Sequence, residues 1–262
     1  MNPSFDKPCF VELPARGLIN IGGDDATRFL QGLISNDINL LDQSPLLYAC
    51  LLTPQGKFLH DFFINRTGNG YLVETEGADR AQDLLRRLTI YKLRSKVTLD
   101  LLPDAHVYVT FGSAHGLPDP RHAGLGSRAL TKPDVPQAPF AVWDELRIGL
   151  GIADGSRDAE LEKSTLEELN LSDTAVSFTK GCYVGQELTA RMEHRNLGKK
   201  HLRALGFKDT APAHGTALMI SNQLIGDMRS SCGKRGLALV RDDALDLLKA
   251  QQHDSEIHLL GQ

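Results

Sequence analysis

The chain has 262 residues, of which 41% are hydrophobic and 24% charged, and its formal net charge is −4 at pH 7. This is an ordinary composition for a globular protein, and the length suits one large domain or two to three small ones. The slightly acidic balance gives no general reason to expect binding to nucleic acid or to a membrane surface, so any site for a polyanion has to be a local patch.

The four cysteines are far apart and include no Cys-x-x-Cys pair: they are Cys9, Cys50, Cys182 and Cys232. This spacing argues against a zinc ribbon, a self-contained iron–sulfur motif and a disulfide framework. Residues 1–16 have neither the apolar core of a secretory signal nor an Arg- and Ser-rich presequence, and no apolar run approaches the about 20 residues that span a membrane. We therefore expect a cytoplasmic protein with no membrane partner and no stably bound metal.

In the first half of the chain, apolar runs bounded by turn residues predict strands, and apolar residues at helical spacing predict two helices. The expected strands are 17–21, 48–53, 58–65, 71–76, 97–101 and 107–111. One helix is expected to begin at an Asp24 N-cap and to stop before Ser35, and the other covers 79–88. Residues 54–57 are the expected turn of a hairpin.

The second half begins with a Gly- and Pro-rich stretch, 112–139, that predicts a long connection or a domain boundary. A helix is expected over 143–150, and the polar residues 154–170 are expected to wind across the surface. From His201 onward short apolar runs alternate with turns, which predicts a small antiparallel barrel with strands at 202–207, 217–220, 226–230 and 236–240. The pattern as a whole predicts an α+β body followed by a small all-β domain.

The central stretch is 180–187, KGCYVGQE, in which Cys182 lies between two glycines. Glycine can adopt backbone angles that other residues avoid, so the thiol is expected at a turn where the chain approaches a ligand closely. A helix that starts near Val184, together with Lys180 and Arg191, would favour the reactive thiolate. From these residues alone, a small buried cysteine in a glycine-rich turn remains an alternative.

A basic run follows this stretch: Arg191, His194, Arg195, Lys199, Lys200, His201 and Arg203. It is interpreted either as a solvated charged face or as a patch that faces an anion.

Residues 176–187 resemble the signature of the folate-binding YgfZ family, which is related to the aminomethyltransferase (T-protein) of the glycine cleavage system. Further stretches that resemble the family are 25–32 with Asn36 and Asp37, 53–61, 91–97, 119–121 with 125–126 and Arg128, 146–148, 154–158 and 236–241. The resemblance implies that 119–128 has defined structure. Two positions depart from the family pattern, because Leu166 replaces a proline and Ser127 replaces an aromatic residue.

The resemblance implies an aminomethyltransferase-like fold in which interleaved α+β subdomains and a C-terminal antiparallel β-barrel surround a channel for tetrahydrofolate or a derivative. The implied first subdomain covers about 1–47 with 113–198, the second about 48–112, and the barrel 199–262. The implied role is help in making or repairing iron–sulfur clusters in other proteins, including enzymes that modify tRNA.

The implied site centres on Cys182 as the functional thiol, with Lys180 and Arg191 beside it. The expected folate contacts are Trp143, Gln31, Asn36, Glu168, Asn170, Tyr183 and Glu187. For Trp143 a place in the core is the alternative, and for Gln31, Asn36 and Glu168 turn chemistry or surface exposure. His60 and Asp61 are neighbours on a strand and point to opposite faces, so we interpret them as structural.

Three functions remain open. The first is a folate-binding accessory factor for iron–sulfur proteins, with Cys182 as a reactive thiol or a transient cluster ligand; because clusters usually take four thiolates, a partner protein or a second small molecule must supply the others. The second is an aminomethyltransferase or another one-carbon transferase, which we rank lower because the T-protein lacks the cysteine motif. The third is a binding module in which folate is a structural ligand and the basic run docks a partner.

Overall fold

The computed structural model describes residues 7–77, 79–102, 105–195, 199–252 and 255–260. These residues form two compact units. The body unit contains the described residues up to Phe140 together with Asp173–Leu188, and the barrel unit contains Ala141–Ser172 and the described residues from Thr189 onward. The last passage of the chain between the units lies within α5 (Gln186–Arg195).

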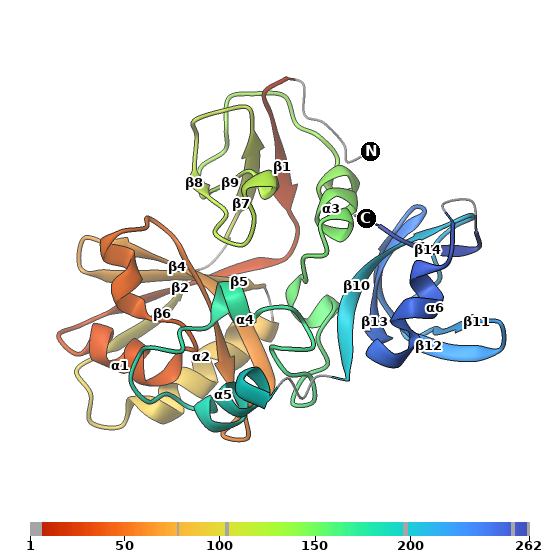
Figure 1. The fold of residues 1–262 in the computed structure, drawn as a ribbon. Coiled ribbons are helices and arrows are strands. Elements are labelled where there is room, and N and C mark those ends of the chain that lie inside the picture. Colours follow the sequence, from red (N-terminus) through yellow and green to blue (C-terminus); the bar gives the residue numbers. More distant parts are fainter. Residues whose placement is uncertain (1–6, 78, 103–104, 196–198, 253–254, 261–262) are drawn as a thin grey trace. The chain divides into compact units, whose positions relative to one another are not determined.

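The body unit contains two antiparallel sheets (Figure 1). The larger sheet has the order β3-β4-β5-β2-β6, with β2 (Arg16–Gly22), β3 (Leu47–Leu52), β4 (Phe58–Thr67), β5 (Gly70–Glu76) and β6 (Thr98–Leu102). The smaller sheet has the order β1-β7-β9-β8, with β1 (Cys9–Leu13), β7 (Val107–Phe111), β8 (Leu117–Pro118) and β9 (Ser127–Ala129). The sheets do not follow the subdomain limits predicted near residues 47 and 112, since β2 lies inside the larger sheet and β7 pairs with β1.

Two helices, α1 (Ala26–Leu33) and α2 (Asp79–Lys92), share the hydrophobic core of the larger sheet. In α1 the buried side chains recur at helical spacing, on Ala26, Phe29, Leu30 and Leu33, as the sequence predicted. The predicted Asp24 N-cap is wrong. Asp25 occupies that position without capping the helix, because its carboxylate instead accepts a hydrogen bond of 2.7 Å from the backbone N–H of Lys96.

The stretch that composition predicted as a connection, 112–139, contains β8, β9 and the 3₁₀ helix η2 (Ala123–Leu125). The expectation of defined structure over 119–128 is confirmed. Its basis is a buried ionic cluster, in which the Arg121 guanidinium donates to Asp119 at 2.8 Å and Arg128 donates to Asp119 at 3.2 Å. Buried charges of this kind need their partners in place, which fixes the loop that carries them.

The barrel unit contains an antiparallel sheet of order β11-β12-β13-β10-β14 around its own apolar core. The strands are β10 (Lys200–Phe207), β11 (Ala217–Ile220), β12 (Gln223–Cys232), β13 (Arg235–Arg241) and β14 (Ile257–Leu259). The four strands predicted from the turn spacing are confirmed, and β14 was not predicted. The remaining elements of the chain are η1 (Ile38–Asp42), α3 (Phe140–Gly149), η3 (Gly155–Arg157), α4 (Ser172–Ala175), η4 (Asp242–Ala244) and α6 (Leu245–Lys249).

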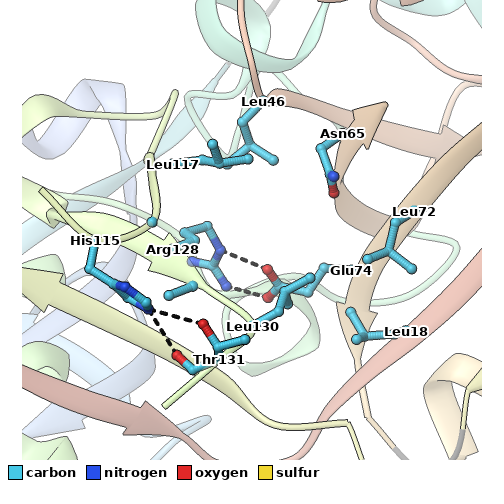
Figure 2. A pocket seen from close by; sticks show the side chains of 12 residues that line it. Leu18, Leu46, Asn65, Leu72, Glu74, His115, Leu117, Arg128, Leu130 and Thr131 are labelled. Carbon is cyan, nitrogen blue, oxygen red and sulfur yellow. Dashed lines mark hydrogen bonds and ion pairs between the residues drawn. The ribbon is translucent and has the colours of Figure 1, made fainter. Parts of the chain in front are cut away.

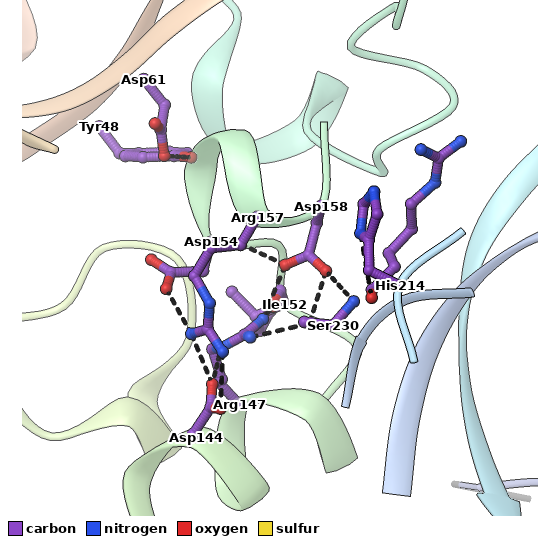
Figure 3. A network of polar contacts seen from close by, with 11 residues as sticks. Tyr48, Asp61, Asp144, Arg147, Ile152, Asp154, Arg157, Asp158, His214 and Ser230 are labelled. Atoms are coloured by element: carbon purple, nitrogen blue, oxygen red, sulfur yellow. Dashed lines mark hydrogen bonds and ion pairs between the residues drawn. The ribbon is translucent and has the colours of Figure 1, made fainter. Parts of the chain in front are cut away.

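The polar stretch 154–170 does not wind across the surface as predicted. Asp158 and Leu169 are each 1% exposed. The reason is a buried ionic network around Arg147 of α3, which is fully buried and donates to Asp144 at 2.7 Å and to Asp158 at 2.8 Å (Figure 3). Asp158 also accepts from the hydroxyl of Ser230 on β12 at 2.6 Å. The network thus connects α3, the 154–170 stretch and the barrel sheet.

Candidate functional site

The cysteine motif is held along the residues that follow α1, inside the body unit. The backbone N–H of Ser177 donates to the carbonyl of Ser35 at 3.1 Å, and that of Val184 donates to the carbonyl of Gly32 at 3.3 Å. The Val184 side chain also packs against the core that contains α1. Both ends of the segment 177–184 are therefore fixed to the same short stretch of chain, 32–35.

Lys180 makes the strongest attachment. Its ammonium donates to the backbone carbonyls of Ile34 at 2.7 Å and Asn36 at 2.8 Å and lies 5.0 Å from the centre of the Tyr183 ring. Burial lowers the pKa of Lys180 to about 8, although the nearby Asp37 carboxylate acts in the opposite direction. Since this ammonium is committed to two carbonyls, Lys180 acts on the position of the segment, which the sequence did not predict.

Cys182 lies between the fixed residues Lys180 and Val184 and is exposed. All four cysteines are free thiols, and Cys50, by contrast, is buried. The alternative of a buried Cys182 is therefore wrong. The helix expected near Val184 begins at Gln186, so its first residue is four positions after the thiol.

Gly185 is the residue of the motif that has to be glycine. Its φ is 86°, and a Cβ there would lie 2.6 Å from the carbonyl oxygen of Thr53 and 2.8 Å from Cβ of Leu52. The motif therefore packs its backbone directly against the end of β3 and the following hairpin turn. Gly181 differs, because a Cβ on it would meet no atom within 4 Å and its φ is not in the left-handed region.

Replacement of Gly185 by alanine should destabilise the body unit, whereas Gly181→Ala should have little effect. The left-handed backbone alone costs about 1–2 kcal/mol with a Cβ, and the overlap with Thr53 and Leu52 adds to this cost. The measurement is urea unfolding, monitored through the hydrogen exchange of the β3 and β4 amides. Equal stability of the two variants would contradict the close packing of the motif.

Arg191, predicted beside the thiol, and Glu187, a predicted folate contact, lie on α5, and Tyr183, another predicted folate contact, lies just before it. Glu187 and Arg191 are exposed, whereas Tyr183 is 8% exposed. Part of the basic run has acidic neighbours: Lys200 lies 3.7 Å from Glu168, and His201 lies 2.8 Å from Asp242. The side chains of His194 and Arg195 lie outside what the structure describes, and the acidic neighbours of Lys200 and His201 oppose the interpretation of the run as a patch for an anion.

Besides Tyr183 and Glu187, two predicted folate contacts, Gln31 and Asn36, belong to the body unit, and both take part in the turn after α1. The Gln31 amide donates to Asp37 at 3.0 Å. The Asn36 side chain is buried and donates to the carbonyls of Tyr48 at 2.9 Å and Thr174 at 3.2 Å. Both amide protons of Asn36 are thus used within the chain, and its side-chain oxygen accepts from the backbone N–H of Asp37 at 2.9 Å, so each polar atom of this side chain already has a partner.

The other three belong to the barrel unit. Trp143 on α3 is 1% exposed, in agreement with the alternative of a core residue. The carboxylate of Glu168 accepts from the backbone N–H of Thr165 at 2.9 Å. Asn170 has a φ of 55° and donates to the carbonyl of Leu202 at 2.7 Å. As contacts of a folate, these residues stay predictions.

A cavity of about 230 Å³ in the body unit was not predicted (Figure 2). Five of its twelve lining residues are leucines, and the ion pair between Glu74 of β5 and Arg128 of β9 lies in it. The Glu74 carboxylate also accepts from Arg16 at 2.8 Å. Only the resemblance drew attention to Arg128, and nothing in the local sequence indicates that Glu74 is its partner.

His60 and Asp61 of β4 have separate partners, as expected for neighbours on a strand. His60 lies 2.9 Å from Asp83 of α2, and burial lowers the pKa of His60 to about 4, so the ring is neutral at pH 7. The carboxylate of Asp61 accepts from the Tyr48 hydroxyl at 2.7 Å.

Within the described part of the chain, no three His, Cys, Asp or Glu side chains come together as a metal site. In the same residues, no helix has the length and apolar character needed to cross a membrane.

Comparisons with known proteins identify relatives of both the sequence and the fold. Residues 199–259 match the family model described as the CAF17 C-terminal beta-barrel domain. The chain is 32% identical over 277 residues to the iron-sulfur cluster assembly factor IBA57, mitochondrial, of Homo sapiens, which covers 88% of this chain and 77% of that protein. It is 36% identical over 219 residues to the IBA57 homolog, mitochondrial, of Pyricularia oryzae, which covers 74% of this chain and 56% of that longer protein.

The structure is similar to that of the glycine cleavage system aminomethyltransferase T from Bartonella henselae, with a TM-score of 0.72. The match covers 89% of this chain and 78% of that chain at 14% identity, so it shows the fold alone. The predicted fold class, an aminomethyltransferase-like α+β fold with a C-terminal antiparallel β-barrel, is confirmed.

Proposed function

The chain belongs to the family of the iron–sulfur cluster assembly factor IBA57, and on this premise we propose that it assists in assembling or repairing iron–sulfur clusters in other proteins. Cys182 is the functional thiol of this proposal. The observation that carries it is the exposure of this thiol on a segment that is fixed on both sides, at Lys180 and at Val184. A thiolate is the form that binds iron or attacks another sulfur.

The geometry favours a bridging role over storage of a cluster. Clusters usually take four thiolates, and the described residues bring no further Cys, His, Asp or Glu ligands to Cys182 to complete such a set. The remaining ligands then come from the protein that delivers or receives the cluster, or from a second small molecule. The identity of these client proteins, including enzymes that modify tRNA, is part of the proposal.

We also propose tetrahydrofolate or a derivative as a ligand, supported by the fold shared with an aminomethyltransferase. The predicted contact set fits it only in part, because Asn36 and Asn170 already spend amide protons on carbonyls of the chain. No step of the proposed function is therefore assigned to folate. Titration with tetrahydrofolate, with thiol labelling of Cys182 before and after, tests whether ligand and thiol are coupled.

One-carbon transfer is the alternative, and the shared fold is the observation that favours it. Incubation with tetrahydrofolate and an aminomethylated lipoyl carrier distinguishes the two functions, because methylene-tetrahydrofolate would form only if the chain is a transferase.

The relatives' names change the proposed compartment. The human and Pyricularia proteins are named as mitochondrial, which does not agree with the cytoplasmic prediction from residues 1–16. We propose that the chain acts in the compartment that these names give, the mitochondrion.

Replacement of Cys182 by alanine should abolish most of the activity of a dependent iron–sulfur enzyme in cells that lack the wild-type chain. Because the thiol is exposed, the variant should unfold at the wild-type temperature. Cys232→Ala, which removes a half-buried thiol of β12, is the matched control and should support full activity. Wild-type enzyme activity with Cys182→Ala, under oxidative stress as well, would exclude the thiol role.

A further inference from the structure

A groove of about 820 Å³ runs between α1 and the C-terminal end of α2 in the body unit. Phe29 and Leu33 of α1 line one side, and Tyr91, Leu93 and Arg94 line the other. The sequence resemblance pointed to residues 91–97, yet neither the cysteine site nor the proposed folate contacts use them. The groove is therefore a separate feature from both.

Leu93 is placed in a way that the stability of the fold does not explain. It follows the last residue of α2 with a φ of 44°, and its side chain is 87% exposed. Glycine or asparagine is the usual residue at this position, because a Cβ is unfavourable there. Leu93 thus adopts an unfavourable left-handed backbone conformation although its side chain is not buried. Its neighbours Ile90 and Tyr91 are 60% and 37% exposed.

The lining of the groove also carries a net positive charge, from two arginines and one aspartate. Arg28 and Arg94 line it, both are exposed, and within the described ranges neither has an ion pair with a carboxylate. Asp25 also lines the groove, where its carboxylate accepts from the backbone N–H of Lys96, and Asp24 lies 3.7 Å from the Lys96 ammonium. An occupant with carboxylates next to an apolar side chain would complement both features.

The groove and the exposed thiol of Cys182 lie in the same unit and are connected through Gly32. Gly32 lines the groove, and its carbonyl accepts the hydrogen bond from Val184, two residues after Cys182. A protein segment seated in the groove would therefore have the rest of its molecule close to the thiol.

We propose that this groove docks an acidic segment of the protein that exchanges a cluster at Cys182. An apolar side chain of that segment packs on Leu93 and Tyr91, and its carboxylates pair with Arg28 and Arg94. The identity of the partner rests on the proposed function, whereas the chemistry of the groove does not.

The first test is binding of the purified full chain to two labelled synthetic peptides of equal length. Each has one central phenylalanine, flanked by four glutamates in one peptide and by four lysines in the other. The acidic peptide should bind at least about tenfold tighter, with an affinity that falls as salt screens the charges. Leu93→Asp, and separately Arg28→Glu with Arg94→Glu, should each weaken it by about tenfold.

The matched controls change the same residue types in the barrel unit. Leu224→Asp replaces a leucine of β12 that is 45% exposed, and Lys208→Glu with Lys249→Glu reverses two exposed lysines. Both should leave peptide binding unchanged. Vesicles that contain anionic phospholipid are included, and binding to them without binding to the acidic peptide would mean that the groove faces a membrane and would overturn the proposal.

The second test measures the dependent iron–sulfur enzyme in cells that carry each variant. If the groove docks the partner, Leu93→Asp and the double arginine reversal each lower the enzyme's activity by about tenfold. The purified variants should unfold at the wild-type temperature, and the control Leu224→Asp should keep full activity. Loss with Cys182→Ala but not with the groove variants overturns the docking surface and leaves the proposed function standing.

Full activity with Cys182→Ala overturns the proposed function instead. The groove is then judged by the peptides alone. Absence of binding by the acidic peptide at about 1 mM, or equal binding of the two peptides, overturns the docking surface.

Discussion

Replacing Arg147 by methionine should lower the free energy of unfolding of the barrel unit by about 3–5 kcal/mol. Methionine fills a similar apolar volume but leaves Asp158, which is 1% exposed, without the guanidinium that neutralises it, while Asp144 keeps only its second partner, Arg157. The hydrogen bond from Arg147 to the Ser230 hydroxyl, 2.8 Å, is lost as well. The expected cost is large because a buried carboxylate without its cation remains where water cannot solvate it.

Trp143 offers a direct measurement, because it is the only tryptophan and lies on the same helix as Arg147. Its fluorescence during urea unfolding reports on the unit that contains the network. Arg241→Met is the control, since Arg241 pairs with Asp243 at the surface and its loss should leave the midpoint unchanged. If the urea midpoint of the Arg147→Met variant equalled that of wild type, the network would not stabilise the unit.

Replacing Glu74 by glutamine should destabilise the body unit by a similar amount, about 3–5 kcal/mol. Glu74 is 6% exposed and pairs with both Arg16 and Arg128, and the Arg128 guanidinium lies 3.8 Å from the centre of the Phe63 ring. Glutamine keeps the shape but removes the charge, so two buried cations lose their shared carboxylate. Hydrogen exchange of the β5 amides, which lie in the middle region of the larger sheet, measures the loss. Glu12→Gln, at an exposed pair with His106, should cost less than about 1 kcal/mol.

The Glu74 contribution should also depend on pH. Burial alone would raise the pKa of Glu74, but Arg128 and Arg16 outweigh it and hold the pKa below its ordinary value of 4.5. At acid pH the unfolded chain takes up a proton at this position before the folded chain does, so stability falls as the pH falls. The difference between wild type and Glu74→Gln should therefore be constant near pH 7 and shrink below about pH 4.5. A difference independent of pH would contradict an ionised Glu74.

Local sequence patterns predicted helices and strands well where the buried residues recur at the spacing of a helix or a strand. The spacing of Phe29, Leu30 and Leu33 predicted α1, and the alternation of short apolar runs with turns predicted the barrel strands. Prediction failed where a polar segment is buried. Residues 154–170 contain too many charged residues to suggest a buried segment. Only the fold shows that Asp158 neutralises Arg147 and also accepts from Ser230, which is far away in the sequence.

In the candidate site, too, some features follow from the local sequence and others only from the fold. The motif around Cys182 was identified from adjacent residues, and the need for glycine at position 185 follows from its contact with Thr53. The role of Lys180 could not be predicted, because its acceptors are backbone carbonyls of residues 34 and 36, which any sequence provides. The groove at Leu93 was equally hidden, since an exposed leucine after a helix resembles any other helix end.

The attachment of 177–184 to the end of α1 has a consequence for how the chain folds during synthesis. The ribosome completes every sheet strand of the body unit before it makes Asp173–Leu188, and 141–172 of the barrel unit emerge in between. Until then the carbonyls of Ile34 and Asn36 lack the Lys180 ammonium, and the backbone of the hairpin turn lacks Gly185. The nascent body unit is therefore incomplete around Cys182, and the segment that carries this cysteine is the last part of the unit to be synthesised.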